Sequence, residues 1–131
     1  MYDLKDEEIK ELSNLVEKIE KFTGKWIEIK PGIPHAFTNE LAQEAMKFLY
    51  EKKLIINFNW AKWNEGREFL KNNDSKKYLN LDREYILKLL TAIARQDRFC
   101  DGVWGNLFES GTALLLDLFD NHIKPLDFQN L

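Results

Sequence analysis

Two arginines and two aspartates fall within seven residues of this chain, and a phenylalanine and a tryptophan lie beside them. The stretch reads RQDRFCDGVWGNLFESG and covers residues 95–111. Its four charged residues at the start are Arg95, Asp97, Arg98 and Asp101. Paired arginines can hold a phosphate or carboxylate in a forked geometry, and aspartates can cap helices or carry protons. The stretch is therefore the first candidate site.

Asp97 continues the apolar stripe of the helix that should precede this stretch. The stripe is spaced i, i+4, i+7 and i+11, at Ile86, Leu90, Ile93 and Asp97. A carboxylate that points toward a core must find a charged or hydrogen-bonding partner. We expect Asp97 to be buried and paired with Arg98, Arg67 or Arg95. Arg95 lies opposite the stripe and should be substantially exposed.

Two interpretations of the stretch remain open. Arg95 and Arg98 lie three residues apart near a helix C-terminus, Asp101 can cap the next short helix, and Gly102 allows close backbone approach. Together they would form a binding site for an anion or a partner. Alternatively, these residues form a structural network of ion pairs and caps, with Phe99 and Trp104 packed into the core on either side.

Trp60 and Trp63 form a second candidate group. They lie three residues apart, and Arg67 would extend the same helical face. We expect both tryptophans to be largely buried core anchors. The alternative is an exposed face for a partner, because Trp and Arg dominate binding hot spots.

The sequence gives little support for a metal site or for a known catalytic motif. His35 and His122 lack a second ligand at metal-site spacing, and the one cysteine, Cys100, can form no cysteine-rich cluster. No glycine-rich phosphate loop or nucleophile elbow is present. We therefore expect no metal and no cofactor, and we nominate no catalytic residue.

The elements that position these residues are helical. Apolar residues recur at helical spacing across 3–22, 39–53, 57–70 and 82–97, and two shorter helices are expected near 103–109 and 112–122. Pro31, Gly32 and Pro34 interrupt this pattern. We predict an all-α fold, with residues 1–131 as a single compact domain of five or six helices and room for one short extended segment near residues 25–37.

Composition narrows the class of partner. The chain has 131 residues, 44% of them hydrophobic, and 19 basic and 22 acidic residues give a formal net charge of −3. General nucleic-acid binding is not expected, because it needs a basic face that neutralises many phosphates. The apolar run ALLLDLF is interrupted by Asp117 and far too short to span a bilayer. With only one cysteine, we expect a cytoplasmic protein without membrane association.

Three segments also resemble an uncharacterised prokaryotic family of unknown function. They are NFNWAKWNEG (57–66), LLTAIARQDRFCDG (89–102) and FESG (108–111). That family carries a W-x-x-W segment, then a leucine-rich helix ending in R-x-x-R-F-x-x-G, then a glycine after a short helix. The resemblance covers roughly the C-terminal half to two-thirds of the chain and leaves out the N-terminal helix. The family has no established activity, so the resemblance supports the choice of residues and implies no chemistry.

Two hypotheses of different class follow. The first is a non-catalytic binding or regulatory module that holds an acidic partner segment or a small anion. It would use the corner formed by residues Arg95 to Trp104, with or without the Trp60–Trp63–Arg67 face. The second is an enzyme acting on a small phosphorylated or carboxylated substrate. In the enzyme, Arg95 and Arg98 would bind the anion while Asp97, Asp101 or Glu109 moves protons. It requires these side chains to converge in one open pocket.

Overall fold

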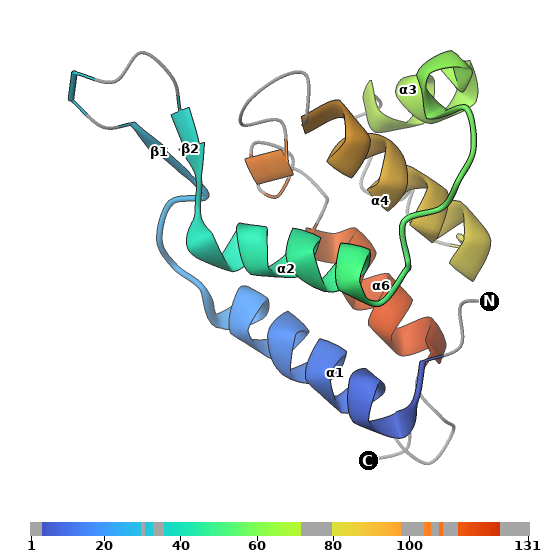
Figure 1. Ribbon diagram of the computed structural model, residues 1–131, viewed down its shortest axis with the longest axis horizontal. Helices are drawn as coiled ribbons and strands as arrows, with labels where there is room; N and C mark the ends of the chain where they lie inside the picture. The colour runs from blue at the N-terminus through green and yellow to red at the C-terminus, as the bar shows by residue number, and fades with distance from the viewer. Residues whose placement is uncertain are drawn as a thin grey trace.

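The computed structural model describes residues 4–29, 31–32, 36–71, 80–97, 104–105, 108 and 113–123. In these ranges the fold is all-α, with five α-helices, one short 3-10 helix and one two-stranded hairpin (Figure 1). The elements are α1 (Asp6–Lys21), β1 (Ile27–Ile29), β2 (Ala36–Thr38), α2 (Glu40–Glu51), η1 (Trp60–Lys62), α3 (Asn64–Lys71), α4 (Arg83–Asp97) and α6 (Ala113–Ile123). The expected all-α fold with a short extended segment near residues 25–37 is confirmed.

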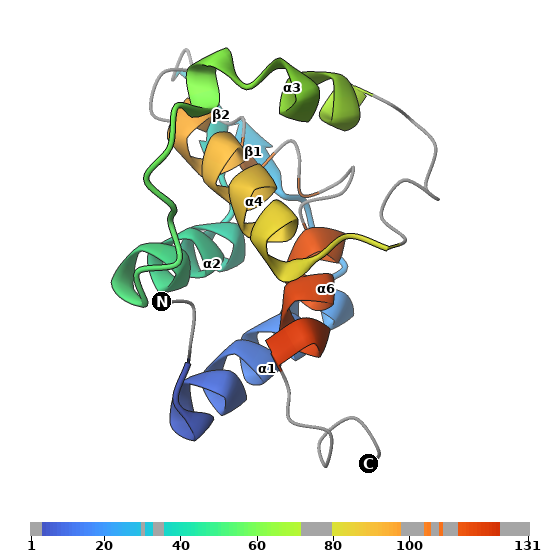
Figure 2. The same cartoon turned by 90° about the vertical axis from the view of Figure 1, so that its right-hand side faces the viewer.

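The four longest helices share one hydrophobic core. α1 packs against both α2 and α6, and α4 packs against α6. Both views place α1 and α3 at opposite ends of the molecule (Figures 1 and 2). The fully buried large side chains come mainly from α1, α2, α4 and α6 and include Leu12, Leu49, Leu90, Leu115 and Phe119. Each helix buries one apolar face, as its sequence period requires.

Helix starts follow the local capping residues. The Asn39 side chain accepts a hydrogen bond from the Leu41 backbone N–H at 2.7 Å, and that of Asp82 accepts one from the Tyr85 backbone N–H at 2.8 Å. Asn and Asp are among the residue types that most often cap helices in this way. At the start of α1 the capping contact comes from a residue inside the helix. The helix begins at Asp6, and the Glu8 carboxylate reaches back to the backbone N–H of Lys5 at 3.0 Å.

The hairpin connects α1 to α2. β1 and β2 pair antiparallel with Ile27 opposite Thr38 and Ile29 opposite Ala36. The ring of Trp26, next to the hairpin, lies 4.3 Å from that of Phe22 and 4.8 Å from that of Phe108. These contacts fix the point where the hairpin joins the helical body. Within the described residues, no helix is both long and apolar enough to cross a membrane.

The segment predicted as one helix from 57 to 70 is divided at Trp63. η1 ends there because the Trp63 backbone adopts ψ 82°, outside the helical region, and α3 begins at the next residue. The Trp63 indole lies over Gly66, where an added Cβ would stand only 2.2 Å from the ring. The sequence pattern alone marks Gly66 as a cost inside a helix, but its missing side chain makes the space for this ring.

Gly66→Ala should therefore lower the free energy of unfolding, although alanine favours helix. Helix propensity alone would stabilise α3 by about 1 kcal/mol, but forcing a Cβ against a packed ring costs about 1 to 3 kcal/mol. Urea unfolding followed by circular dichroism measures the net effect. In a Trp63→Ala background the ring is absent, so the same change should become stabilising. If Gly66→Ala stabilises both backgrounds equally, this account of the glycine is wrong.

Candidate functional site

The carboxylate of Asp97, at the end of α4, caps the segment that follows. Its Oδ1 accepts a hydrogen bond from the backbone N–H of Trp104 at 3.0 Å. Asp97 is half-buried rather than buried, and within the described ranges no ion pair joins it to Arg67 or Arg95. The backbone N–H of Trp104, seven residues further along the chain, thus lies against this carboxylate. Within the described residues, the partner of Asp97 is thus a peptide N–H and neither Arg67 nor Arg95, while Arg98, the third arginine that we expected, lies outside them.

Trp104 anchors the same corner in the core. Its side chain is completely buried, and its indole Nε1–H donates to the Ala42 carbonyl oxygen of α2 at 2.6 Å. The ring packs edge-on against Phe108 at 5.2 Å, and Phe108 in turn contacts Trp26. Trp104 thus ties together α2, the end of α4 and the approach to the hairpin. For Asp97 and Trp104, the contacts match the structural interpretation of the corner.

Arg95 has a different environment. Its guanidinium lies over the ring of Tyr50, on α2, at 5.6 Å from the ring centre. Tyr50 is 37% exposed, and Arg95 is half-buried, less exposed than the helical wheel indicates. The reason is that α2 approaches the last turn of α4, so the side chain lies along a neighbour instead of in water. Arg95 thus joins the predicted stretch to the partly exposed ring of Tyr50 on α2.

Asp97→Ala should lower the free energy of unfolding only moderately. Losing a cap-type hydrogen bond costs about 0.5 to 2 kcal/mol, whereas leaving a buried ion pair broken costs about 3 to 5 kcal/mol. Thermal and urea unfolding of Asp97→Ala and Asp97→Asn distinguish the two. If both variants lose about 3 to 5 kcal/mol, the Asp97 carboxylate also forms an ion pair with a buried arginine.

The second candidate group lies on η1 and α3 and packs against the first turn of α4. Trp60 and Trp63 are half-buried, and the Trp63 ring packs against Phe58 at 5.5 Å and Tyr85 at 5.4 Å. Tyr85 is in the first turn of α4, and Arg95 follows ten residues later, about 15 Å along the helix axis. The contacts of these two groups are thus separate.

The side-chain hydrogen bond of Arg67 lies within the η1–α3 segment and not toward Arg95. The Arg67 guanidinium donates to the Ala61 carbonyl oxygen within its own segment, and its side chain is exposed. Tyr85, in the first turn of α4, has a pKa above its ordinary value, because burial and then the nearby Glu65 carboxylate raise it. Its phenol therefore remains protonated at neutral pH.

The remaining predicted residues fall outside the described ranges. They are Arg98, Phe99, Asp101 and Gly102, together with Cys100, Glu109 and His35. His122 is exposed near the end of α6. No three His, Cys, Asp or Glu side chains in the described part of the chain are placed to hold a metal ion.

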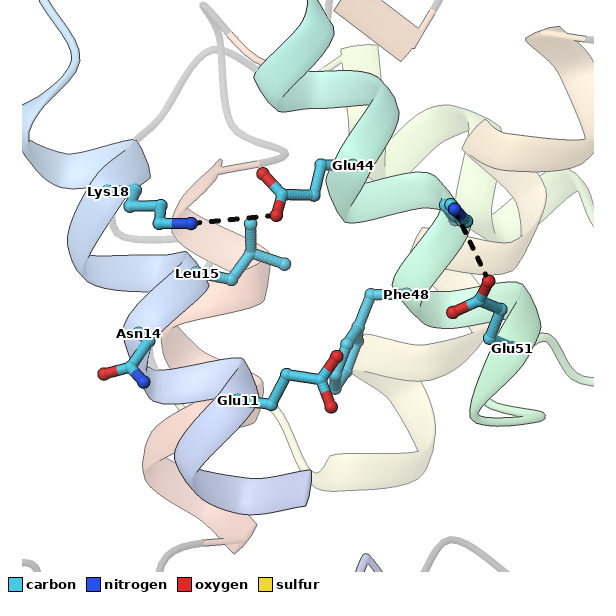
Figure 3. A pocket seen from close by; sticks show the side chains of 8 residues that line it. Glu11, Asn14, Leu15, Lys18, Glu44, Phe48 and Glu51 are labelled. Carbon is cyan, nitrogen blue, oxygen red and sulfur yellow. Dashed lines mark ion pairs between the residues drawn. The ribbon is translucent and has the colours of Figure 1, made fainter. Parts of the chain in front are cut away.

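A groove that the sequence analysis missed lies between α1 and α2. It has a volume of about 300 Å³. Its floor is formed by Leu15 and Phe48, which are almost completely buried, and its rim is polar (Figure 3). The polar lining consists of Glu11, Asn14 and Lys18 from α1 and of Glu44, Lys47 and Glu51 from α2.

The rim charges form pairs near the upper limit of ion-pair distance. Lys18 and Glu44 approach to 3.7 Å across the groove. Lys47 and Glu51 lie 3.8 Å apart on one face of α2. Each trio is spaced i, i+3 and i+7, which places its members along one helix face. That spacing was a usable signal, but only the packing of α1 against α2 makes the two faces oppose.

Comparison with known proteins identifies a family and no activity. A model described as a family of unknown function, DUF6508, matches residues 4–120. The match includes the N-terminal helix, which the resemblance seen in the sequence left out. No curated protein and no solved structure matches the chain.

Proposed function

Because the chain belongs to DUF6508, a family of unknown function, we propose its role from its own surface: a non-catalytic module that binds an acidic segment of another protein. The contact surface is the outer side of α2 together with the last turn of α4. The proposal includes a cytoplasmic location, which the single cysteine supports.

The observation that carries this proposal is the Tyr50–Arg95 pair. Tyr50 is one of two exposed large hydrophobic residues among those described, and the Arg95 guanidinium already lies over its ring. Tyrosine and arginine are the residue types that dominate protein-binding hot spots. An arginine that is held in place loses less side-chain entropy when it binds, so the pair is preorganised for a partner.

The charge of Arg95 determines the chemistry of the partner. No carboxylate of the described residues lies within ion-pair distance of its guanidinium. An arginine over an aromatic face still presents its N–H edge, and that edge matches a carboxylate in a bidentate geometry. An acidic side chain of a partner protein fits this position.

The enzyme hypothesis has less support in the described residues. It needs an acid and both arginines around one cavity, but the Asp97 carboxylate is engaged by the Trp104 backbone. The groove between α1 and α2 is lined by carboxylates that are more than half exposed and paired with lysines. Solvated pairs of this kind lack the environment that tunes a catalytic acid or base.

The proposal can be tested by titrating the ¹⁵N-labelled protein with an acetylated Gly-Glu-Gly-Glu-Gly peptide. Amides around Tyr50 and Arg95 should shift saturably, with a dissociation constant on the order of 1 mM for so short a probe. Arg95→Ala should weaken binding about tenfold while changing the free energy of unfolding by only about 0.5 to 1 kcal/mol, the contribution of an exposed cation–π pair.

Lys10→Ala is the matched control, because it removes an exposed positive charge from α1. If Lys10→Ala and Arg95→Ala weaken binding equally, the peptide only senses net charge and the proposed surface is wrong. Inorganic phosphate provides the other arm of the test. If phosphate shifts the same amides and the peptide does not, the surface takes a small anion instead.

A further inference from the structure

The groove between α1 and α2 carries an uncompensated negative charge. Three carboxylates and two ammonium groups line it, so their formal charges sum to −1. Beside it, Lys52 pairs with Glu8 at 3.7 Å and with the lining residue Glu11 at 3.2 Å. The positive charge of Lys52 and the negative charge of Glu8 cancel, so including both residues leaves the sum at −1. An occupant that completes the charge balance brings one positive charge.

The positions of the carboxylates indicate what kind of cationic group would fit the groove. Glu11 from α1 and Glu51 from α2 stand on either side of Phe48 (Figure 3). Their side chains are 54% and 55% exposed. The Glu51–Lys47 pair is a surface pair, whereas Lys52, which pairs with Glu11, is only 22% exposed and is shared with Glu8. A surface pair contributes about 0 to 1 kcal/mol, so Glu51 can turn to a new cation at little cost. Glu11 can keep Lys52 and still accept from a second cation, because a carboxylate has two oxygens and about four lone-pair sites.

The floor and the volume define the rest of the occupant. Leu15 and Phe48 offer an apolar base between the two carboxylates, and about 300 Å³ accommodates one long side chain. An arginine has an aliphatic stem for such a base and a planar fork of donors that can reach two carboxylates at once. A lysine carries a compact charge without this fork, and an acidic side chain would meet three carboxylates.

We propose that this groove accepts an arginine side chain of the partner protein, with its stem on Leu15 and Phe48 and its guanidinium between Glu11 and Glu51. This inference rests on the proposed protein-binding function and adds a second contact to it. Tyr50 and Glu51 are neighbours on α2, so one bound segment could place an acidic residue on Arg95 and an arginine in the groove. The partner segment is then of mixed charge.

The test titrates the full chain with acetyl-Gly-Arg-Gly-amide and follows backbone amides by NMR. Leu15, Asn14 and Phe48 should shift saturably, with a dissociation constant on the order of 1 mM. The matching peptide with citrulline, which has the same shape without the charge, should bind at least about tenfold more weakly, and the lysine peptide should lie between the two. This series needs no variant, so it holds even if a substitution disturbs folding.

Variants then locate the contact. Glu11→Gln/Glu51→Gln should weaken binding of the arginine peptide about tenfold. Glu7→Gln/Glu17→Gln removes two exposed carboxylates from α1 outside the groove lining and should have little effect. Equal loss in both double variants would show attraction to net charge alone and would overturn the inference. So would shifts that are absent from the groove, or equal binding of the citrulline peptide.

The two proposals fail separately. Arg95→Ala should leave the titration with the arginine peptide unchanged, because Arg95 does not line the groove. If the acidic peptide binds at Tyr50 and Arg95 but the arginine peptide does not bind in the groove, the proposed function stands and this inference falls. If the arginine peptide binds as expected while the acidic peptide does not, the groove is a binding site and the Arg95 surface is not.

Discussion

Trp104→Ala is expected to lower the free energy of unfolding by about 3 to 5 kcal/mol, the range for emptying a large buried aromatic site. Trp104 is completely buried, and three elements depend on it through Ala42, Phe108 and Asp97. No neighbouring backbone can close such a space without moving a helix. Urea unfolding monitored by circular dichroism measures the loss.

Trp104→Phe separates the volume of the ring from its hydrogen bond. Phenylalanine keeps an aromatic ring against Phe108 but removes the Nε1–H donor to the Ala42 carbonyl. We expect a loss of about 1 to 3 kcal/mol, smaller than that of alanine. If both variants unfold at the wild-type urea midpoint, Trp104 is not the anchor of this corner and the structural interpretation fails.

Asp120→Ala is expected to cost about 1.5 to 3 kcal/mol, the range for a hydrogen bond to a charged group. Asp120 on α6 is only 2% exposed, and its Oδ1 accepts a hydrogen bond from the Ser13 hydroxyl of α1 at 2.8 Å. The bond joins α1 to α6 through two residues that are 107 positions apart in the sequence. Replacing the carboxylate leaves the serine hydroxyl with a methyl group in place of its acceptor.

A double-mutant cycle isolates this contact from the other interactions of Asp120. Ser13→Ala alone should also destabilise, because it takes a donor from a buried carboxylate. In the Ser13→Ala background, Asp120→Ala should cost less, with a coupling energy between about 0.5 and 3 kcal/mol. Strictly additive losses in urea unfolding would mean that the hydrogen bond is not made in solution.

Trp104 and Asp120 hold the fold, and neither belongs to the proposed binding surface. Arg95, Tyr50, Glu11 and Glu51 are partly or largely exposed, so their replacement can be measured in a folded protein. Asp97 and Trp104 came from the same candidate stretch as Arg95. Their substitution would report on stability before it reported on binding.

Much of the architecture was determined by local sequence. The apolar stripe of α4 placed its buried face correctly, and Asp82 and Asn39 act as the caps that their positions indicate. These features depend on helical periodicity and on hydrogen bonds between residues two or three positions apart. Pro31 and Gly32 marked the interruption where the hairpin forms.

Contacts between distant segments were decided only by the tertiary structure. The helical period directed Asp97 inward, but the choice of the Trp104 N–H as its partner depends on the path of the chain after α4. Among the tryptophans, composition could not distinguish the buried Trp104 from the half-buried Trp60 and Trp63. Burial depends on which elements cover a side chain, and local pattern does not contain that information.

The same reason explains Gly66 and the groove. A glycine within a helical pattern indicates a weak helix former, and only the fold of η1 onto α3 shows that the Trp63 ring needs its space. Charged residues at i, i+3 and i+7 on α1 and α2 look like two ordinary solvated faces. They become one groove because α1 and α2 pack together, with Leu15 and Phe48 in the core beneath the charged residues. That packing is between two helices distant in the sequence, so neither helix alone indicates the groove.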